Sequence, residues 1–369
     1  MEPRYRFDFG TGDPAEGYTK VGPGAAYDGA AAGYGFTRTE RVNAKDRGEP
    51  GPLRRDFCIP LDTAFVVDVP DGTYRIAALI GDEIAPTETT IRVGQGRLVL
   101  HKQRTAPGHY ARFVFAARVT GGSLKLTFGG LTPRINALEI DPAPDACTIF
   151  LAGDSTVTDQ PDDGYPYAGW GQMLPMFVKP DAAVANYALS GRSSKSFIGE
   201  GALDRIWQAI KPNDYLLVQF GHNDQKPDAE RRTEPFATYK ETLKIYIDGA
   251  RERGAIPILV TSVQRRFFEA DGTLSDTHGD YLVAMRELAA EENVPLVDLA
   301  ARSKELFERL GPEKTKDLFM WLAPGEFANF PDGAQDNTHF QQQGGIEVAR
   351  LVYEELKRLQ LQPLTLFLR

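Results

Sequence analysis

The chain of 369 residues has little cysteine and no long hydrophobic run. Its two cysteines, Cys58 and Cys147, are too few for a disulfide framework or a zinc cluster, so we interpret both as reduced, packed thiols. No stretch approaches the roughly eighteen consecutive apolar residues that a membrane helix needs. We therefore expect no membrane partner. The hydrophobic fraction of 42% and the charged fraction of 25% are close to those of folded globular chains, which excludes disorder and coiled coil as the main state.

An apolar leader, a metal-ligand pattern and an excess of positive charge are also missing. The start of the chain lacks the apolar segment of a secretory signal, so we expect a cytoplasmic protein. A signal trimmed ahead of Met1 would leave the same start. No two of the five histidines have metal-ligand spacing, so we expect no zinc. The net charge of −9 argues against a nucleic-acid partner, which would need a basic face.

Charge and pattern divide the chain into two parts. Residues 1–145 hold 18 Lys and Arg against 18 Asp and Glu, whereas residues 146–369 hold 24 against 33 and carry the whole net charge. The first part consists of short strand-like runs between Gly- and Pro-containing turns, which indicates an antiparallel β-sandwich. The predicted strands span 5–9, 56–69, 72–80, 89–93, 97–100, 109–119, 123–128 and 135–140. The Pro-rich stretch 141–145 is the predicted linker, so we expect domains at 1–145 and 146–369.

The second part alternates short apolar runs with helix-like segments. The predicted strands span 147–152, 183–189, 215–220, 256–262 and 294–299, and the clearest predicted helices span 235–253, 279–292, 301–310 and 342–359. Strands that are buried on both faces have such continuous apolar runs, and their alternation with helices indicates right-handed βαβ units. We therefore predict an α/β fold with a flavodoxin-like, doubly wound, five-stranded parallel sheet. In this architecture functional groups collect at the carboxyl ends of the strands.

Polar groups suited to acyl transfer follow these predicted strands. Ser155, Gly191 and Asn223 come after the first three runs, and Asp336 and His339 precede the last helix. A serine nucleophile needs a base such as imidazole, whose tautomer a carboxylate fixes. The spacing of three residues lets one short loop or helical turn present Asp336 and His339 to Ser155. The backbone amides of Ser155 and Gly191 and the side-chain amide of Asn223 would form an oxyanion hole. Taken singly, these residues also fit helix-cap, turn and surface-loop roles.

Four motifs resemble the sequence blocks of the SGNH (GDSL-type) hydrolases: Gly153-Asp-Ser-Thr, Gly191, Gly221-His-Asn-Asp and Asp336-x-x-His339. Segments 186–197 and 218–224 narrow the resemblance to the rhamnogalacturonan acetylesterases of carbohydrate esterase family 12. The first part, with Phe7-Asp-Phe-Gly, resembles the galactose-binding-like sandwich of some bacterial members. The resemblance implies a serine esterase that removes acetyl groups from pectic oligo- or polysaccharides without a metal or organic cofactor. In the cytoplasm it would trim imported oligosaccharides.

Several residues near these blocks are candidates for substrate binding. Arg192 and Lys195 could meet the carboxylates of galacturonate, although ordinary helix-end charge would also explain them. His222 could form a wall of the cleft or lie behind it, and His278 could line the substrate groove. Trp170 could stack on a sugar or belong to the core.

Other features leave the substrate open. The pairs Arg231-Arg232 and Arg265-Arg266 could add positive charge for a polyanionic substrate, although we favour a solvated face for each pair. The same triad could act on acetylxylan, another acyl ester or a lipid, although no excess of apolar residues between the blocks would line a lipid channel. A carbohydrate-binding protein with a minor hydrolase role is the remaining alternative. The exact sugar, the acetyl position, the role of the sandwich and the oligomeric state are not given by the sequence.

Overall fold

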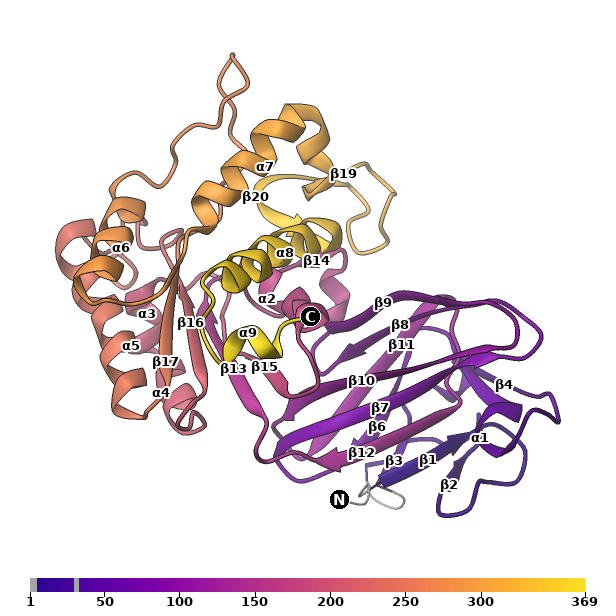
Figure 1. Cartoon of the computed structure of the whole chain (residues 1–369). Helices are drawn as coiled ribbons and strands as arrows, with labels where there is room; N and C mark the ends of the chain where they lie inside the picture. The colour runs from indigo at the N-terminus through magenta and orange to yellow at the C-terminus, as the bar shows by residue number, and fades with distance from the viewer. Residues whose placement is uncertain (1–4, 30–32) are drawn as a thin grey trace. The chain divides into compact units, whose positions relative to one another are not determined.

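A computed structural model describes residues 5–29 and 33–369, which divide into two compact units (Figure 1). The first unit comprises Met1–Ala146 and Val178–Ala183, and the second comprises Cys147–Phe177 and Val184–Arg369. The first unit is therefore not one continuous segment of the chain, because it also includes Val178–Ala183. Within the described segments no helix is both long enough and apolar enough to cross a membrane.

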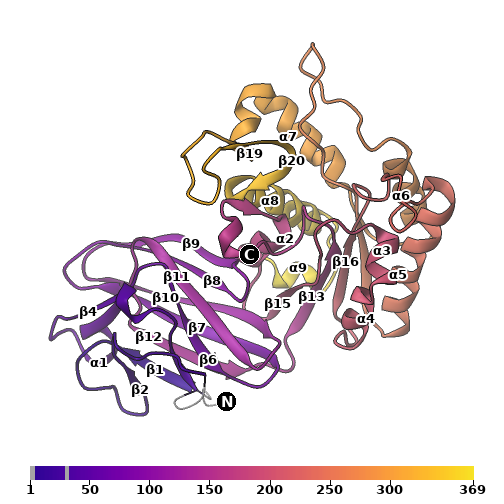
Figure 2. The ribbon, with the colours of Figure 1, turned by 180° about the vertical axis from the view of Figure 1, so that it is seen from behind.

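The first unit is an all-β sandwich of two five-stranded sheets, as predicted (Figure 2). One sheet has the order β10 (His109–Val119), β7 (Gly72–Asp82), β12 (Ala137–Pro142), β1 (Tyr5–Phe9), β2 (Thr19–Val21). The other has the order β3 (Tyr34–Phe36), β6 (Thr63–Asp68), β11 (Ser123–Thr132), β8 (Thr87–Val93), β9 (Arg97–Thr105). A separate antiparallel pair, β4 (Val42–Asp46) and β5 (Asp56–Pro60), is linked by the short helix α1 (Pro52–Arg55), and η1 (Thr39–Arg41) precedes it.

Successive side chains of a strand point to opposite faces of the sheet, and those that point between the two sheets form the core of the sandwich. In β1, Phe7 and Phe9 point inward and meet Phe65 of β6 edge-on, with ring centroids 5.2 and 5.0 Å away. Aromatic pairs of this geometry add to the free energy gained from burying their apolar area. The strands β2, β3 and β4 were not predicted, because β2 and β3 have only three residues each and β4 has a single buried residue, Val42.

The second unit contains the predicted doubly wound sheet. Its five strands have the order β15 (Ala182–Asn186), β13 (Cys147–Gly153), β16 (Tyr215–Gln219), β17 (Ile256–Val260), β18 (Leu296–Val297). The pairs β13–β16, β16–β17 and β17–β18 are parallel, and all seven residues of β13 are buried. The flavodoxin-like order is therefore confirmed, with strand β13 at the point where the order reverses.

Helices cover both faces of this sheet (Figures 1 and 2). On one face, α3 (Ser194–Gly199), α4 (Ala202–Trp207), α5 (Lys240–Glu252) and α6 (Asp280–Glu291) share a core with Phe150 and Leu216 of the sheet. On the other face α2 (Trp170–Met173) packs against α8 (Gln342–Arg358), where Gly345 lets the two helices approach closely. The remaining helical segments are η2 (Asp162–Gly164), η3 (Leu174–Phe177), η4 (Pro235–Tyr239), α7 (Leu299–Lys314), η5 (Thr315–Asp317) and α9 (Leu364–Phe367).

A small antiparallel sheet was not expected from the sequence. It has the order β14 (Tyr167–Ala168), β20 (Ala334–Gln341), β19 (Phe319–Leu322). Asp336 and His339 lie on strand β20, so the prediction of a loop or helical turn for this pair is wrong. Pairing with β19 on one side and β14 on the other fixes the backbone that carries both side chains.

Candidate active site

The site lies at the carboxyl ends of the central strands of the parallel sheet. Ser155 follows β13, Gly191 follows β15 and Asn223 follows β16. Because these three strands are neighbours in the order β15-β13-β16, their carboxyl ends lie side by side at one edge of the sheet. Strand β20 adds His339, which completes the group from outside this sheet.

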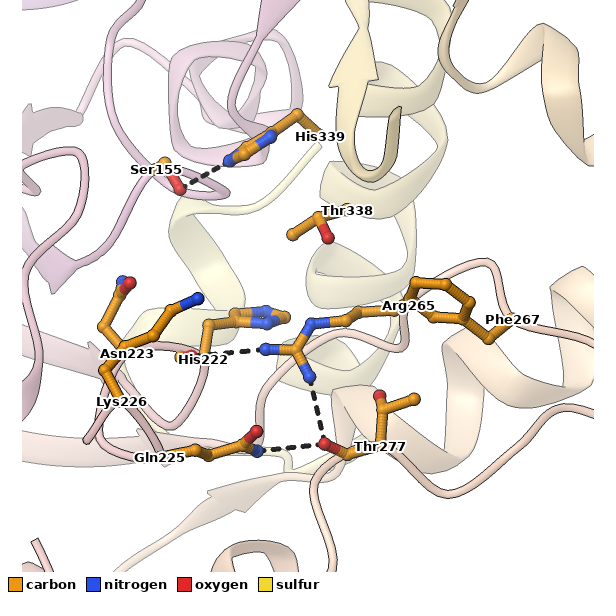
Figure 3. Close-up of a pocket in the computed structure, with 10 residues that line it drawn as sticks. All are labelled: Ser155, His222, Asn223, Gln225, Lys226, Arg265, Phe267, Thr277, Thr338 and His339. Atoms are coloured by element: carbon orange, nitrogen blue, oxygen red, sulfur yellow. Dashed lines mark hydrogen bonds between the residues drawn. The ribbon is translucent and has the colours of Figure 1, made fainter. Parts of the chain in front are cut away.

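Ser155, His339 and Asp336 form a hydrogen-bonded chain, and Figure 3 shows its first hydrogen bond, between Ser155 and His339. Ser155 Oγ lies 2.9 Å from His339 Nε2, and His339 Nδ1 lies 2.7 Å from Asp336 Oδ2. The other oxygen, Asp336 Oδ1, accepts the backbone N–H groups of Thr338 at 2.6 Å and His339 at 3.0 Å. Burial acts to raise the pKa of Asp336, but its hydrogen bonds, chiefly to His339, outweigh burial and lower the pKa. An ionised Asp336 keeps the proton on Nδ1, so Nε2 can accept the proton of Ser155.

A buried arginine holds the strand that carries this pair. Arg266 is 7% exposed, and its Nη1 donates to Asn337 Oδ1 at 3.0 Å, while its Nε donates to Thr315 Oγ1 at 3.1 Å. The Arg266 guanidinium lies 4.7 Å from the ring centroid of Trp321, whose Nε1 also donates to Asn337 Oδ1 at 2.9 Å. Asn337 stands between Asp336 and His339 in sequence. The interpretation of Arg266 as a solvated residue is therefore wrong, because its guanidinium fixes β20.

A chain of buried hydrogen bonds holds the turn that presents Ser155. Asp154 Oδ1 accepts from the backbone N–H and the hydroxyl of Thr156, at 2.9 and 2.7 Å. Gln219 donates to the Thr156 hydroxyl at 2.7 Å and accepts from Trp170 Nε1 at 2.8 Å. Burial raises the pKa of Asp154 to about 6. Trp170 is 1% exposed, so its ring supports this turn from the core and does not fit the sugar-stacking hypothesis.

The predicted oxyanion donors Gly191 and Asn223 follow the two strands that flank β13, and Asn223 lines the pocket together with Ser155. Gly191 has a φ of +80°, and a Cβ there would meet no atom within 4 Å, so the backbone faces open space. Asn223 Nδ2 donates to the carbonyl of Arg192 at 3.1 Å, which leaves its second N–H for a ligand. The two loops are tied together because Ser194 Oγ donates to Asp224 Oδ1 at 2.5 Å. Burial raises the pKa of Asp224 to about 6.

A pocket of about 380 Å³ opens in front of Ser155 (Figure 3). Its lining residues are Ser155, His222, Asn223, Gln225, Lys226, Arg265, Phe267, Thr277, Thr338 and His339. Phe267 is the one large apolar side chain in this lining. In residues 5–29 and 33–369, no group of three or more His, Cys, Asp or Glu side chains is placed to hold a metal ion.

Two further histidines form a buried pair at this pocket. His222 Nδ1 and His278 Nε2 lie 3.1 Å apart, and the residues are 4% and 2% exposed. Burial lowers the pKa of both, that of His278 to about 3, so both rings are neutral at pH 7. His222 lines the pocket, whereas His278 is not among the lining residues and supports His222 from behind. The buried His222 Nε2 has no hydrogen-bond partner among the described residues.

Of the cations that the sequence suggested for the substrate, the structure brings only Arg265 to the pocket, together with Lys226. Arg192 pairs with Glu200 at 2.8 Å, and Lys195 Nζ donates to a backbone carbonyl at 2.6 Å, so neither lines the pocket. Arg265 and Lys226 line it instead. Arg265 is partly buried, so the interpretation of the Arg265-Arg266 pair as a solvated face is wrong for both members. Arg265 follows strand β17, so the strand-end rule applied to this fourth strand could have identified it.

Comparisons with known proteins agree with this geometry. The GDSL-like lipase/acylhydrolase family matches residues 151–344, and the galactose-binding-like domain of β-agarase/YXIM esterase-like proteins matches residues 5–95. The first match covers the whole of the site described above, and the second lies within the sandwich.

Individual relatives extend these matches to nearly the full chain. The rhamnogalacturonan acetylesterase RhgT of Bacillus subtilis is 49% identical over 213 residues, which cover 58% of this chain and 90% of RhgT. The uncharacterized esterase YxiM of Bacillus subtilis is 32% identical over 376 residues, covering 97% of this chain and 92% of YxiM. The crystal structure of YxiM has a TM-score of 0.54 at 31% identity and covers 97% of this chain and 99% of the YxiM chain. The chain therefore belongs to the GDSL-like lipase/acylhydrolase family and has an N-terminal galactose-binding-like domain.

Proposed function

We propose that the protein is a serine esterase that hydrolyses O-acetyl esters on pectic saccharides. The observation that carries the chemistry is the hydrogen-bonded chain from Ser155 through His339 to Asp336, with distances of 2.9 and 2.7 Å. The substrate class rests on similarity, since RhgT, named a rhamnogalacturonan acetylesterase, is 49% identical to this chain. A second relative, YesY of Bacillus subtilis, named a probable rhamnogalacturonan acetylesterase, is 45% identical and is covered over 95% of its length.

The first half of the reaction transfers the acetyl group to the enzyme. His339 Nε2 takes the proton of Ser155 as Oγ forms a bond to the acetyl carbonyl carbon, and Asp336 stabilises the resulting imidazolium. Negative charge then develops on the carbonyl oxygen, where the donors are the backbone N–H groups of Ser155 and Gly191 and the free N–H of Asn223. The carbon–oxygen bond to the sugar breaks, and His339 returns its proton to the departing sugar oxygen. The product is acetyl-Ser155 and a free sugar hydroxyl.

The second half uses water in place of the serine. His339 Nε2 accepts a proton from water as the water oxygen attacks the acetyl carbon, and the same donors hold the second oxyanion. The bond to Ser155 Oγ breaks, and His339 gives the proton back to Oγ. Acetate leaves, and the chain of hydrogen bonds is restored without any redox change.

The pocket lining favours a short acyl group. Nine of its ten residues are polar or charged, and Phe267 alone offers a large apolar surface. An octanoyl chain would leave most of its apolar area without an apolar partner in this pocket. We therefore expect kcat/KM on p-nitrophenyl acetate to exceed that on p-nitrophenyl octanoate by more than tenfold.

The test of the proposed function is acetate release from acetylated rhamnogalacturonan oligosaccharides, with acetylated xylan in parallel. We expect release from the pectic substrate by the wild-type protein and a loss of roughly 10³-fold or more in kcat for Ser155→Ala. The circular dichroism spectrum and melting temperature of the variant control for folding. Wild-type turnover by Ser155→Ala would refute the mechanism. Release from xylan alone would refute the substrate class.

A further inference from the structure

The pocket beside Ser155 contains positive charge that no acidic side chain of its lining balances. Its lining includes Arg265 and Lys226 but no Asp or Glu. This arrangement runs against the composition of the domain, because residues 146–369 hold 33 acidic and 24 basic side chains. Two cations of a mainly acidic domain therefore line the same pocket as the candidate nucleophile Ser155.

Arg265 is held in place by neutral groups. Its Nη1 donates to the carbonyl of Thr277 at 3.0 Å, and its Nη2 donates to the carbonyl of His222 at 3.2 Å. Gln225 donates to the same Thr277 carbonyl at 3.0 Å, which fixes that acceptor. Among the described residues no carboxylate forms an ion pair with Arg265. Burial lowers the pKa of its guanidinium, and the charge of the more distant Asp154 offsets this only in part. A partly buried charge without an ion-pair partner is costly, and an anionic ligand would reduce that cost.

The remaining N–H donors of Arg265 suit a ligand that offers oxygen acceptors. A guanidinium has five N–H groups, and the two contacts of Arg265 leave three of them. Next to it lies the ring of His222, whose Nε2 is buried and has no partner within the described residues (Figure 3). Ser155 and His339 lie across the pocket from Arg265 in the same view. A saccharide whose acetyl group reaches Ser155 would therefore place a neighbouring group against Arg265.

We propose that Arg265, with Lys226 at the exposed rim, binds the carboxylate of a uronate unit in the acetylated saccharide. The inference rests on the proposed function, and it adds that the pocket selects acidic over neutral acetyl esters. Arg265 suits this role because a planar guanidinium binds a carboxylate through parallel hydrogen bonds. Lys226 has an exposed side chain and no ion pair within the described segments, so its charge is available to the same ligand.

The decisive experiment changes the substrate and leaves the wild-type protein intact. We would measure kcat/KM for acetate release from acetylated rhamnogalacturonan oligosaccharides with free carboxylates, and from the same oligosaccharides after methyl esterification. We expect the free acid to be preferred roughly 10–100-fold, the range that a charge-assisted hydrogen bond supplies. The preference should shrink as salt concentration rises, because ions screen the rim charge of Lys226.

Substitutions then identify the residues that cause the preference for the free acid over the methyl ester. Arg265→Gln should reduce the ratio of kcat/KM between acid and methyl ester to near one, and Lys226→Gln should reduce it several-fold. Lys244→Gln is the matched control, because it removes a lysine charge from helix α5, where Lys244 pairs with Asp248 and Glu292 outside the pocket. Its ratio should equal that of the wild type.

The outcomes separate this inference from the proposed function. Equal rates on the acid and the methyl ester by the wild type would overturn the inference and leave the acetylesterase proposal standing. A loss of activity in Arg265→Gln with an unchanged ratio would also overturn it, since Arg265 would then only tie two loops. No acetate from either substrate, with p-nitrophenyl acetate still cleaved, would overturn both the pectic substrate and the inference.

Discussion

The two histidines that line the pocket have opposite surroundings. His339 has a carboxylate behind it, with Nδ1 2.7 Å from Asp336, and the nucleophile Ser155 in front. His222 has a second imidazole behind it, with Nδ1 3.1 Å from His278, and no described partner at Nε2. Both rings belong to one pocket, yet only the first has a negative partner that can stabilise an added proton.

This difference determines what each ring can do. A proton on His339 is stabilised by Asp336, so the ring can accept and return a proton during each half of the reaction. Burial lowers the pKa of His222, and the positive charge of Arg265 lowers it further. His222 therefore stays neutral and offers one fixed hydrogen-bonding position. The comparison shows that the partner of a histidine, more than its place in the pocket, decides between a base and a binding residue.

The largest effect is expected when the hydrogen bond between His339 and Asp336 is disrupted. Asp336→Asn should lower kcat on p-nitrophenyl acetate by about 10²–10⁴-fold, because an amide N–H facing Nδ1 favours the wrong imidazole tautomer. The corresponding change behind the other ring, His278→Gln, should lower kcat by less than about tenfold, since His222 moves no proton. Steady-state kinetics of both variants test the contrast. Equal losses would mean that the His222–His278 pair takes part in proton transfer.

The sequence predicted the parts of this site that follow regular strands. Ser155, Gly191 and Asn223 were predicted because buried parallel strands appear as continuous apolar runs and place their carboxyl ends together. Strand β20 was not predicted, since its sequence, Ala-Gln-Asp-Asn-Thr-His-Phe-Gln, has no alternation of apolar residues. Its conformation comes from pairing with β19 and from the side chain of Arg266, and neither contact is local in sequence.

The surroundings of the two neighbouring arginines could not be predicted from the local sequence either. As a doublet, Arg265 and Arg266 look like solvated charge, but the segment after β17 turns them to different surroundings. Arg265 lines the pocket beside His222, and Arg266 is buried against Trp321 and donates to Asn337. Local sequence does not contain this information, because the acceptors and the aromatic ring come from distant parts of the chain. Trp170 is a similar case, since only the structure shows Gln219 accepting from its indole.

An effect of intermediate size is expected when the support of His339 by Arg266 is weakened. Arg266→Lys keeps a charge but loses the contacts to both Asn337 and Thr315, so strand β20 should hold His339 less firmly. We expect kcat on p-nitrophenyl acetate to fall about tenfold with little change in KM, and the unfolding free energy to fall by about 1–3 kcal/mol. Urea unfolding and steady-state kinetics measure the two effects.

The matched variant for this prediction is Arg265→Lys, a change in the neighbouring arginine that does line the pocket. It should change the preference between acid and methyl ester while leaving the stability loss smaller than that of Arg266→Lys, because Arg265 is less buried. The same change in substrate preference for Arg266→Lys would contradict a positioning role, since Arg266 does not line the pocket.

The smallest expected effect concerns two carboxyl groups with opposite shifts. Burial raises the pKa of Asp154 from 3.8 to about 6, whereas hydrogen bonds to His339 and to backbone amides outweigh burial and lower the pKa of Asp336. Between about pH 4 and 6 the folded protein therefore holds a proton on Asp154 that the unfolded chain has lost, so this group makes stability fall as pH rises. Asp336 contributes stability above pH 3.8 that is lost as pH falls further.

Asp154→Asn separates these two contributions. The amide cannot ionise, so the unfolding free energy of this variant should decline less between pH 4 and 7 than that of the wild type, as measured by urea unfolding at several pH values. Asp336→Asn serves as the control, because its difference from the wild type should change below pH 4 and not between pH 4 and 7. Parallel pH profiles for Asp154→Asn and the wild type would mean that Asp154 ionises in the folded protein as readily as in the unfolded chain. The buried hydrogen bonds to Thr156 would then be strong enough to offset the cost of burying the charge beside Ser155.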